Sequence, residues 1–226
     1  ERWKRFLDGV GGDAAKKKKK KKHYEVFTRD LVRGVVQHIK ERCMEKEIGK
    51  TRVVVVLELG ARDGTFARAF VREWTDERTR LEYFACDSAP KDASVTKRDA
   101  SEAIREIGKK YEGRDSDTLC IALVSWMPFQ IDWTREIRKN AAFDEYILIG
   151  EGEGGICGSK QTWREDEGDD QSDGDDDKEG EEDDVPALYE REGFVMRELE
   201  KVKNLGKSDT TYEREGTHSK TISFRR

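Results

Sequence analysis

The spacing of apolar residues changes several times along the chain, and each change predicts a different structural element. Between residues 24 and 46 apolar side chains recur every four positions, from Phe27 to Cys43, and this spacing predicts an amphipathic helix. Residues 52–59 form a nearly continuous run of branched apolar side chains, which is typical of a strand buried on both faces of a parallel sheet. Similar runs predict further strands at residues 81–86, 118–124 and 145–149.

Helical patterns and turn residues occupy the segments between these strands. A helix is expected from Thr65 onward, a short strand near Val95, and two closing strands at residues 194–201 and 219–226. Further helices are predicted at residues 101–110, 131–140 and 185–192. Strands that alternate with helices imply right-handed βαβ units. The predicted fold is therefore an α/β protein with an open, mostly parallel, seven-stranded Rossmann-like sheet and helices on both faces.

Two low-complexity runs account for much of the charge. Residues 16–22 are seven consecutive lysines, and residues 165–184 contain fourteen acids and one lysine. The acidic run has too little apolar area to fold. We therefore expect a polar, basic N-terminal arm at residues 1–23 and a single domain at residues 24–226, with a disordered acidic insertion at residues 164–184. Leaving both runs out brings the formal net charge from −5 to near zero, which gives no reason to expect a nucleic-acid partner.

The four cysteines are scattered, and none belongs to a Cys-x-x-Cys pair. This spacing favours buried free thiols in a reducing compartment over disulfides or a zinc site, so no metal is expected. No apolar stretch approaches the roughly 20 residues that span a bilayer, so no membrane partner is expected either. Together these features predict an intracellular protein, with the cytoplasm preferred and an organelle left open.

The turn after the first predicted strand is the first candidate for a ligand site. Gly60 and Gly64 flank this turn, and glycines let the backbone turn sharply and approach a ligand closely. Asp87 follows the second strand, where an acid can accept hydrogen bonds from the ribose hydroxyls of an adenosine. Asp87 could also cap a helix or a turn. The glycine turn and the acid together favour an adenosine-containing ligand.

The details of this turn distinguish two kinds of ligand. The dinucleotide fingerprint is Gly-x-Gly-x-x-Gly, with the pyrophosphate at a helix N-terminus. Here the spacing is Gly-x-x-x-Gly, and Glu58 lies two residues before the first glycine. An anion at that point repels a pyrophosphate, whereas it suits a ligand with a cationic amino group and a sulfonium. The electrostatics therefore favour S-adenosylmethionine over NAD.

The segment VVVLELGARDGTF resembles the first motif of class I S-adenosylmethionine-dependent methyltransferases. In that family an acid and three glycines surround the methionine and ribose parts of the cofactor. Glu58, Gly60 and Gly64 match this motif. Arg62 stands where the family has its middle glycine, so its side chain must point away or partly close the pocket. The resemblance also implies a ribose-binding role for Asp87.

Two further segments resemble motifs of the same family. Asp99-Ala100 is similar to the third motif, whose acid meets the adenine amino group, although Asp99 could at the same time cap the helix that follows. After the fourth strand, family members that methylate amine nitrogens carry Asp/Asn-Pro-Pro-aromatic, whereas this chain has Ser125 in place of the acid or amide. The cofactor-binding residues that the resemblance implies are Glu58, Gly60, Ala61, Arg62, Gly64, Asp87, Ser88, Asp99, Ala100 and Ser125.

Trp126, Met127 and Pro128 follow Ser125 and are the candidates for contact with a substrate. Trp126 could instead be a core residue or a pocket wall, because large aromatic side chains are usually buried. None of the three histidines falls in a recognisable catalytic motif, so each is expected to be structural or exposed and no catalytic residue is nominated.

The end of the chain adds to the resemblance. Gly193-Phe194 precedes one predicted strand and another strand closes the chain, which is similar to the antiparallel last pair of these methyltransferases. The resemblance implies an S-adenosylmethionine-dependent methyltransferase whose acceptor is left open among protein, RNA and small molecule. The alternatives are a catalytically inactive binding or scaffold protein with the same fold and a nucleotide-binding oxidoreductase.

Overall fold

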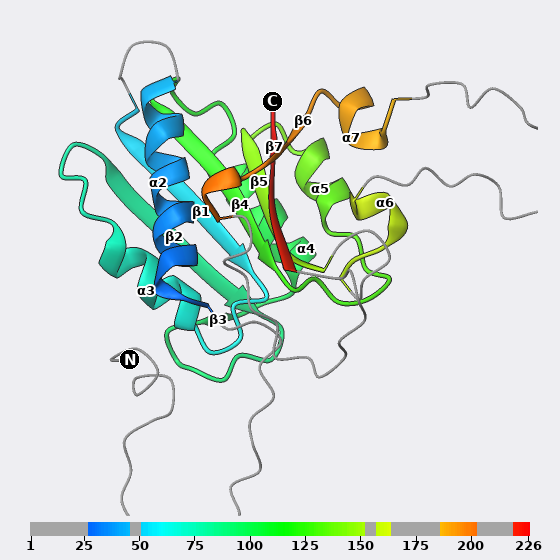
Figure 1. Ribbon diagram of the computed structural model, residues 1–226, viewed down its shortest axis with the longest axis horizontal. Helices are drawn as coiled ribbons and strands as arrows, with labels where there is room; N and C mark the ends of the chain where they lie inside the picture. The colour runs from blue at the N-terminus through cyan, green and yellow to red at the C-terminus, as the bar shows by residue number, and fades with distance from the viewer. Residues whose placement is uncertain (1–26, 46–50, 152–156, 164–185, 203–218) are drawn as a thin grey trace, which may run out of the picture.

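The computed structural model describes residues 27–45, 51–151, 157–163, 186–202 and 219–226 (Figure 1). The expected N-terminal arm, with its lysine run, and the expected acidic insertion lie outside the described residues. The domain boundaries drawn from composition therefore stay predictions.

Within the described residues, seven strands form one open sheet. In spatial order they are β3 (Thr96–Lys97), β2 (Arg80–Asp87), β1 (Val53–Leu59), β4 (Thr118–Ser125), β5 (Glu145–Glu151), β7 (Ser219–Arg225) and β6 (Val195–Glu198). The first five strands of the chain are parallel, and β7 runs antiparallel to both of its neighbours. The predicted open, mostly parallel Rossmann-like sheet with an antiparallel last strand is confirmed.

Helices cover both faces of this sheet (Figure 1). One face is covered by α2 (Arg29–Glu45) and α3 (Thr65–Glu73), and the other by α4 (Ala100–Lys110) and α5 (Thr134–Lys139). Three shorter helical segments complete the described part of the chain: α6 (Lys160–Trp163), α7 (Leu188–Arg191) and the 3-10 helix η1 (Glu200–Val202).

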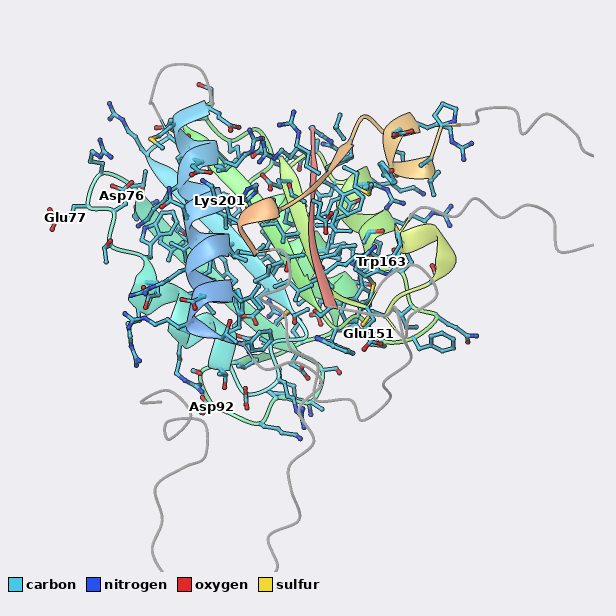
Figure 2. The ribbon with its side chains drawn as sticks, viewed as in Figure 1. Asp76, Glu77, Asp92, Glu151, Trp163 and Lys201 are labelled. Carbon is cyan, nitrogen blue, oxygen red and sulfur yellow. The ribbon has the colours of Figure 1, made fainter. Side chains whose placement is uncertain are left out.

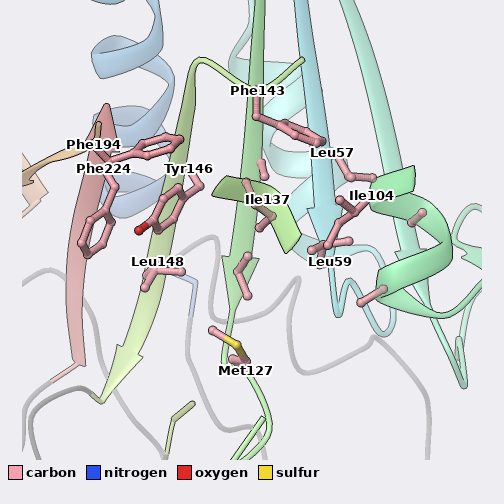
Figure 3. Packing of buried hydrophobic residues seen from close by; sticks show 14 of the residues in the cluster. Leu57, Leu59, Ile104, Met127, Ile137, Phe143, Tyr146, Leu148, Phe194 and Phe224 are labelled. Atoms are coloured by element: carbon pink, nitrogen blue, oxygen red, sulfur yellow. The ribbon is translucent and has the colours of Figure 1, made fainter. Parts of the chain in front are cut away.

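Two apolar layers hold the helices on the sheet. Successive side chains of a strand point to opposite faces, so Val54 and Val56 pack under α2 and α3 while Val55 packs on the side of α4 and α5. Both faces of β1 are therefore buried, which explains its run of branched apolar residues. On the α5 side Tyr146 stacks on Phe224, with ring centroids 4.5 Å apart, and this pair joins β5 to β7 (Figure 3).

A close contact between α2 and η1 depends on a glycine. A Cβ at Gly34 would lie 2.0 Å from Cγ1 of Val202, so any larger residue there would push η1 away from α2. The strand predicted at residues 194–201 is too long, because the chain leaves the sheet after Glu198 and turns into η1 to make this contact.

The helix predicted at residues 131–140 is also too long, since α5 begins only at Thr134. The preceding residues form a loop in which Gln130 has a left-handed φ of 63°. The amide of Gln130 donates to the carbonyl of Gly158 at 2.8 Å, which ties the loop after β4 to the segment after β5. Because of this hydrogen bond the chain forms a loop where the first turn of the predicted helix was expected.

The described residues also bear on thiols, metals and membranes. All four cysteines are described, and each is buried and outside any disulfide, which confirms the expectation of buried, unbridged cysteines, while the reducing compartment stays a prediction. Within the described ranges, no three His, Cys, Asp or Glu side chains are grouped so that they could hold a metal ion. None of the helices in those ranges has both the length and the apolar character that crossing a bilayer requires.

Candidate functional site

The loops after β1 and β4 meet at the carboxyl edge of the sheet, along which Figure 2 labels Asp92 and Glu151. The chain leaves β1 toward β2 on one side and leaves β4 toward β5 on the other, so these loops flank the point where the strand order reverses. A Cβ at Gly60 would lie 3.5 Å from the carbonyl oxygen of Ser125 and 3.9 Å from the ring of Trp133. Open α/β sheets bind their ligands beyond the carboxyl ends of the strands at such a point.

The loop after β1 places alternate residues in left-handed backbone conformations. The φ angle is 75° at Gly60, 47° at Arg62 and 67° at Gly64. Glycine adopts this conformation without a steric penalty, whereas a residue with a Cβ loses about 1–2 kcal/mol. Arg62 therefore keeps a backbone shape that suits glycine although it carries a side chain. Strained residues of this kind concentrate at functional sites.

Hydrogen bonds from β2 and the residues that follow it hold this loop in place. The carboxylate of Asp87 accepts from the Arg62 amide at 2.9 Å, and the Arg62 carbonyl accepts from the Lys91 amide at 2.8 Å. The buried Ala61 donates its amide to the carbonyl of Cys86 at 3.0 Å. These three hydrogen bonds offset the strain at Arg62.

Gly64 leaves room for the loop after β2. A Cβ at this position would lie 3.0 Å from Cγ2 of Val95 and 3.1 Å from both the Arg68 guanidinium and the Ser94 hydroxyl. α3 begins at the next residue, so its N-terminus lies at the carboxyl edge of the sheet. Gly64 thus satisfies two demands at once: a left-handed turn and a close approach between two loops.

Glu58 lies on β1 and is buried, with 1% of its surface exposed. Within the described part of the chain its carboxyl accepts a hydrogen bond from the Tyr83 hydroxyl at 2.8 Å and forms no ion pair with a lysine or arginine. Burial is the main cause that raises the pKa of Glu58 to about 7; the negative charges of Asp63 and Asp87 add to it, whereas the Tyr83 hydrogen bond and the positive charge of Arg68 oppose it. A fully buried carboxyl without a cationic partner is costly unless a ligand supplies one.

Glu58 and Asp87 lie at the same edge of the sheet. The register of β1 and β2 pairs Leu59 with Cys86, so Asp87 lies just beyond the end of the β1 ladder. The two oxygens of Asp87 accept from the amides of Arg62 and Ala89, at 2.9 and 2.7 Å. A carboxylate oxygen has two lone pairs, so each oxygen can still accept from a ligand hydroxyl.

Asp99 follows β3 and begins α4. Its side chain accepts from the amide of Ser101 at 2.9 Å, so Asp99 does cap the helix. The amide of Arg98 donates to the carbonyl of Asp87 at 2.9 Å, which places Asp99 close to the end of β2. Asp99 is exposed and has a second carboxylate oxygen available, whereas Ala100 is buried. Capping therefore leaves Asp99 able to accept from a ligand.

The residues after β4 differ strongly in exposure. Ser125 is buried, and within the described residues its hydroxyl has no hydrogen-bond partner. Trp126 has a left-handed φ of 54° and lies half-buried against the apolar layer. Met127 is 3% exposed and belongs to the core, whereas Pro128 and, near β2, Ser88 are exposed.

The structure brings three residues to this edge that the sequence did not single out. Tyr83 is the hydrogen-bond partner of Glu58, Trp133 lies over Gly60, and Lys91 holds the carbonyl of Arg62. Nothing local marks these residues: Tyr83 lies inside a predicted strand and Trp133 inside a predicted helix. Phe129, in the loop after β4, is 62% exposed at the same edge and is the most exposed large apolar residue in the described ranges.

Two comparisons with known proteins found no match, and a third found distantly similar solved structures. No protein-family model matches the chain, and no curated protein matches it. Among solved structures, it is similar to the DszA carbon methyltransferase at 10% identity and a TM-score of 0.40, over 84% of this chain and 52% of that one. It is also similar to the CurJ carbon methyltransferase at 12% identity and a TM-score of 0.32, over 54% of this chain and 35% of that one. The chain thus spans about half of the first protein and about a third of the second, and both similarities are too distant to indicate its activity.

Proposed function

We propose that this chain is an S-adenosylmethionine-dependent methyltransferase that binds its cofactor across the loops after β1, β2 and β4. The observation that carries the proposal is the buried carboxyl of Glu58, which has a phenol as its partner and no ion pair in the described residues. It lies beside a left-handed loop and at the same edge as Asp87. This arrangement suits a cationic ligand with a ribose and opposes a pyrophosphate.

Each part of the cofactor has a matching group at this edge. Glu58 would bind the amino group of the methionine moiety, because an ionised carboxyl in a buried position is strongly stabilised by a cation. The free lone pairs of Asp87 would accept from the ribose hydroxyls, and Asp99 would accept from the adenine amino group. The hydroxyl of Ser125, which has no hydrogen-bond partner in the part of the chain that the structure describes, would gain a hydrogen bond from the same ligand.

The cofactor, when bound, supplies an activated methyl group on a sulfonium. The contribution of the protein is then to align the acceptor with that methyl group and to exclude water, which is worth roughly 7–11 kcal/mol in well-oriented reactions. We expect the loop after β4 to do this, and its position beside the β1 loop and its hydrogen bond from the Gln130 amide to the segment after β5 support that role. We nominate no general base.

A catalytically inactive binding protein with the same cofactor site is the alternative. Ser125 favours it, because nitrogen-methylating members of the resembled family carry an acid or amide at that position and a hydroxyl accepts hydrogen bonds more weakly. Labelled cofactor incubated with cell-extract fractions separates the two. Transfer of label to a protease- or nuclease-sensitive fraction, or to small molecules, supports the enzyme and identifies the acceptor class. Binding without transfer in every fraction supports the alternative.

Calorimetry tests the binding site itself. The chain should bind S-adenosylmethionine and S-adenosylhomocysteine and should not bind NAD. Glu58→Gln should weaken S-adenosylmethionine about 10- to 100-fold, since it removes a charge-assisted hydrogen bond. The matched control is Glu112→Gln, an exposed acid after α4 at the opposite edge, which should leave the affinity unchanged. Binding of neither sulfur compound to the wild-type chain would overturn the proposal.

A further inference from the structure

Trp133 lies over the junction of the two loops that form the proposed cofactor site. Its ring carbons Cζ3 and Cη2 are 3.9 and 4.0 Å from the position that a Cβ on Gly60 would occupy. The carbonyl oxygen of Ser125 is 3.5 Å from the same position. The indole is half-buried, so one part of it packs on the apolar layer and another part stays accessible.

The backbone of Trp133 is fixed from both sides. Its amide donates to the sulfur of the buried Met127 at 3.3 Å, and its carbonyl accepts from the amide of Ile137 at 3.2 Å. The next residue, Thr134, donates its amide to the carboxylate of Asp132 at 3.0 Å and begins α5. The ring is therefore carried by a helix start that is held in place before any ligand binds, and preorganised groups contribute most to recognition.

Two carboxyl groups lie at the same edge of the sheet as the ring. Glu58 and Asp87 supply negative charge at the ends of β1 and β2, and the described residues place no lysine or arginine in an ion pair with Glu58. The face of an indole attracts cations, and the attraction is stronger when water is partly excluded. A sulfonium is a weakly hydrated cation that suits such a surface.

We propose that Trp133 forms an aromatic wall against the sulfonium and that its ring makes the site prefer the charged methyl donor over the neutral thioether product. This inference rests on the proposed function. The neutral sulfur of S-adenosylhomocysteine carries no charge for the ring to attract, so the same residue that holds the donor aids release of the product. Trp133 is then a residue that determines the ratio of two affinities rather than the affinity for adenosine itself.

The test compares affinities for S-adenosylmethionine and S-adenosylhomocysteine in the wild-type chain, Trp133→Phe and Trp133→Leu, by calorimetry. Trp133→Leu should weaken S-adenosylmethionine about 2- to 30-fold and should weaken S-adenosylhomocysteine much less, while Trp133→Phe should lie between wild type and Trp133→Leu. The matched control is Trp74→Leu, a half-buried tryptophan after α3, which should leave the ratio unchanged. Thermal unfolding of each variant shows that it is folded.

Four outcomes would overturn the inference. Equal losses of affinity for S-adenosylmethionine and S-adenosylhomocysteine would show that Trp133 only shapes the pocket. Tighter binding of S-adenosylmethionine by Trp133→Leu would show that the ring blocks the site. A wild-type chain that binds both compounds while every variant keeps the same ratio would refute the role of Trp133 and leave the proposed function standing. A wild-type chain that binds neither compound would refute the proposed function, and this inference with it.

Discussion

Two buried glutamates, at opposite edges of the same sheet, have contrasting surroundings. Glu145 begins β5 at the amino edge, where its carboxylate lies 2.5 Å from Nε2 of His38 and accepts from Arg42 at 2.9 Å and from Ser223 at 2.6 Å. Glu58, at the carboxyl edge, accepts a hydrogen bond from Tyr83. Among the described residues, the carboxylate of Glu145 is surrounded by donors from α2 and β7, whereas the carboxyl of Glu58 has one hydrogen-bond donor, the phenol of Tyr83.

The pKa values of the two residues follow this difference. Burial pushes the pKa of Glu145 up, but the hydrogen bonds of His38 and Ser223 and the charge of Arg225 outweigh it, so the pKa of Glu145 is lowered. At Glu58 burial prevails and raises the pKa to about 7. A fully partnered carboxylate stabilises the fold, whereas a carboxyl with few partners at the carboxyl edge fits the proposed role in binding a ligand.

The backbone shows the same contrast between the two edges. Among the described residues, the non-glycine residues with left-handed φ are Arg62, Trp126 and Gln130. All three lie in the loops after β1 and β4, at the carboxyl edge. The described residues therefore concentrate strain at the edge where Glu58 also forms no ion pair with them, which is the pattern expected of a binding site.

The largest effect should come from the amino edge. Glu145→Gln removes the buried carboxylate that the half-buried Arg42 and Arg225 share and leaves them paired with the half-exposed Glu45, so the free energy of unfolding should fall by about 3–5 kcal/mol. Urea unfolding followed by fluorescence measures this. Glu45→Gln is the control within the same network: its side chain is half exposed, so it should cost about 0–1 kcal/mol. If both variants lowered the free energy of unfolding by the same small amount, Glu145 would not be a stabilising residue, and its contrast with Glu58 would be lost.

The next largest effect is expected for Glu58→Gln, which should raise the free energy of unfolding by an amount that depends on pH. The pKa of Glu58 is raised from 4.5 to about 7, so the fold favours the protonated form. The stability that this group contributes is complete below its unfolded pKa and is lost as the pH rises through about 7, which costs roughly 3 kcal/mol at about pH 8. Glu58→Gln should therefore be more stable than the wild-type chain by roughly 3 kcal/mol at about pH 8, with a gap that narrows toward about pH 5.

Urea unfolding of the ligand-free protein across this pH range checks the prediction for Glu58. A variant that is more stable yet binds the cofactor more weakly would show that Glu58 is kept for binding at the expense of stability. A destabilised Glu58→Gln would instead place Glu58 with Glu145, as a structural residue.

The smallest effect concerns the strained loop. Arg62→Gly removes the Cβ from a left-handed residue, so it should stabilise the protein by about 1 kcal/mol. Arg105→Gly, an exposed position within α4, is the matched control and should destabilise by about 0.5–1 kcal/mol. Thermal unfolding distinguishes the two signs. A loss of stability in Arg62→Gly would mean that its side chain contributes more than the backbone strain costs.

The sequence predicted the sheet well because its signal is local. Runs such as residues 52–59 and 118–124 are apolar on both faces, and only a buried parallel strand satisfies them. Boundaries were less well predicted where a contact with a distant segment decides them. The chain leaves β6 early to reach Gly34, and α5 starts late because Gln130 is tied to Gly158.

The residues of the candidate site likewise fall into those that the local sequence identifies and those that only distant contacts bring to the site. The glycine spacing and the acids after the strands could be read from the sequence, since a turn of this kind and the end of a strand are local features. Tyr83 and Trp133 could not, because one becomes a partner of Glu58 only through the register of β1 and β2, and the other reaches Gly60 only when α5 docks.

By itself, the sequence determined which segments form strands and where the chain turns sharply, because the period of apolar side chains and the conformational freedom of glycine act within a few residues. It placed Glu58 and Glu145 in similar apolar strands and singled out Glu58 only by its position before the glycine turn, without indicating the partners of either carboxyl. Only the tertiary structure decided that Glu145 meets His38, Arg42 and Ser223 while Glu58 meets Tyr83. The charge state of a buried acid depends on what surrounds it in space, and those neighbours come from elements far apart in the chain.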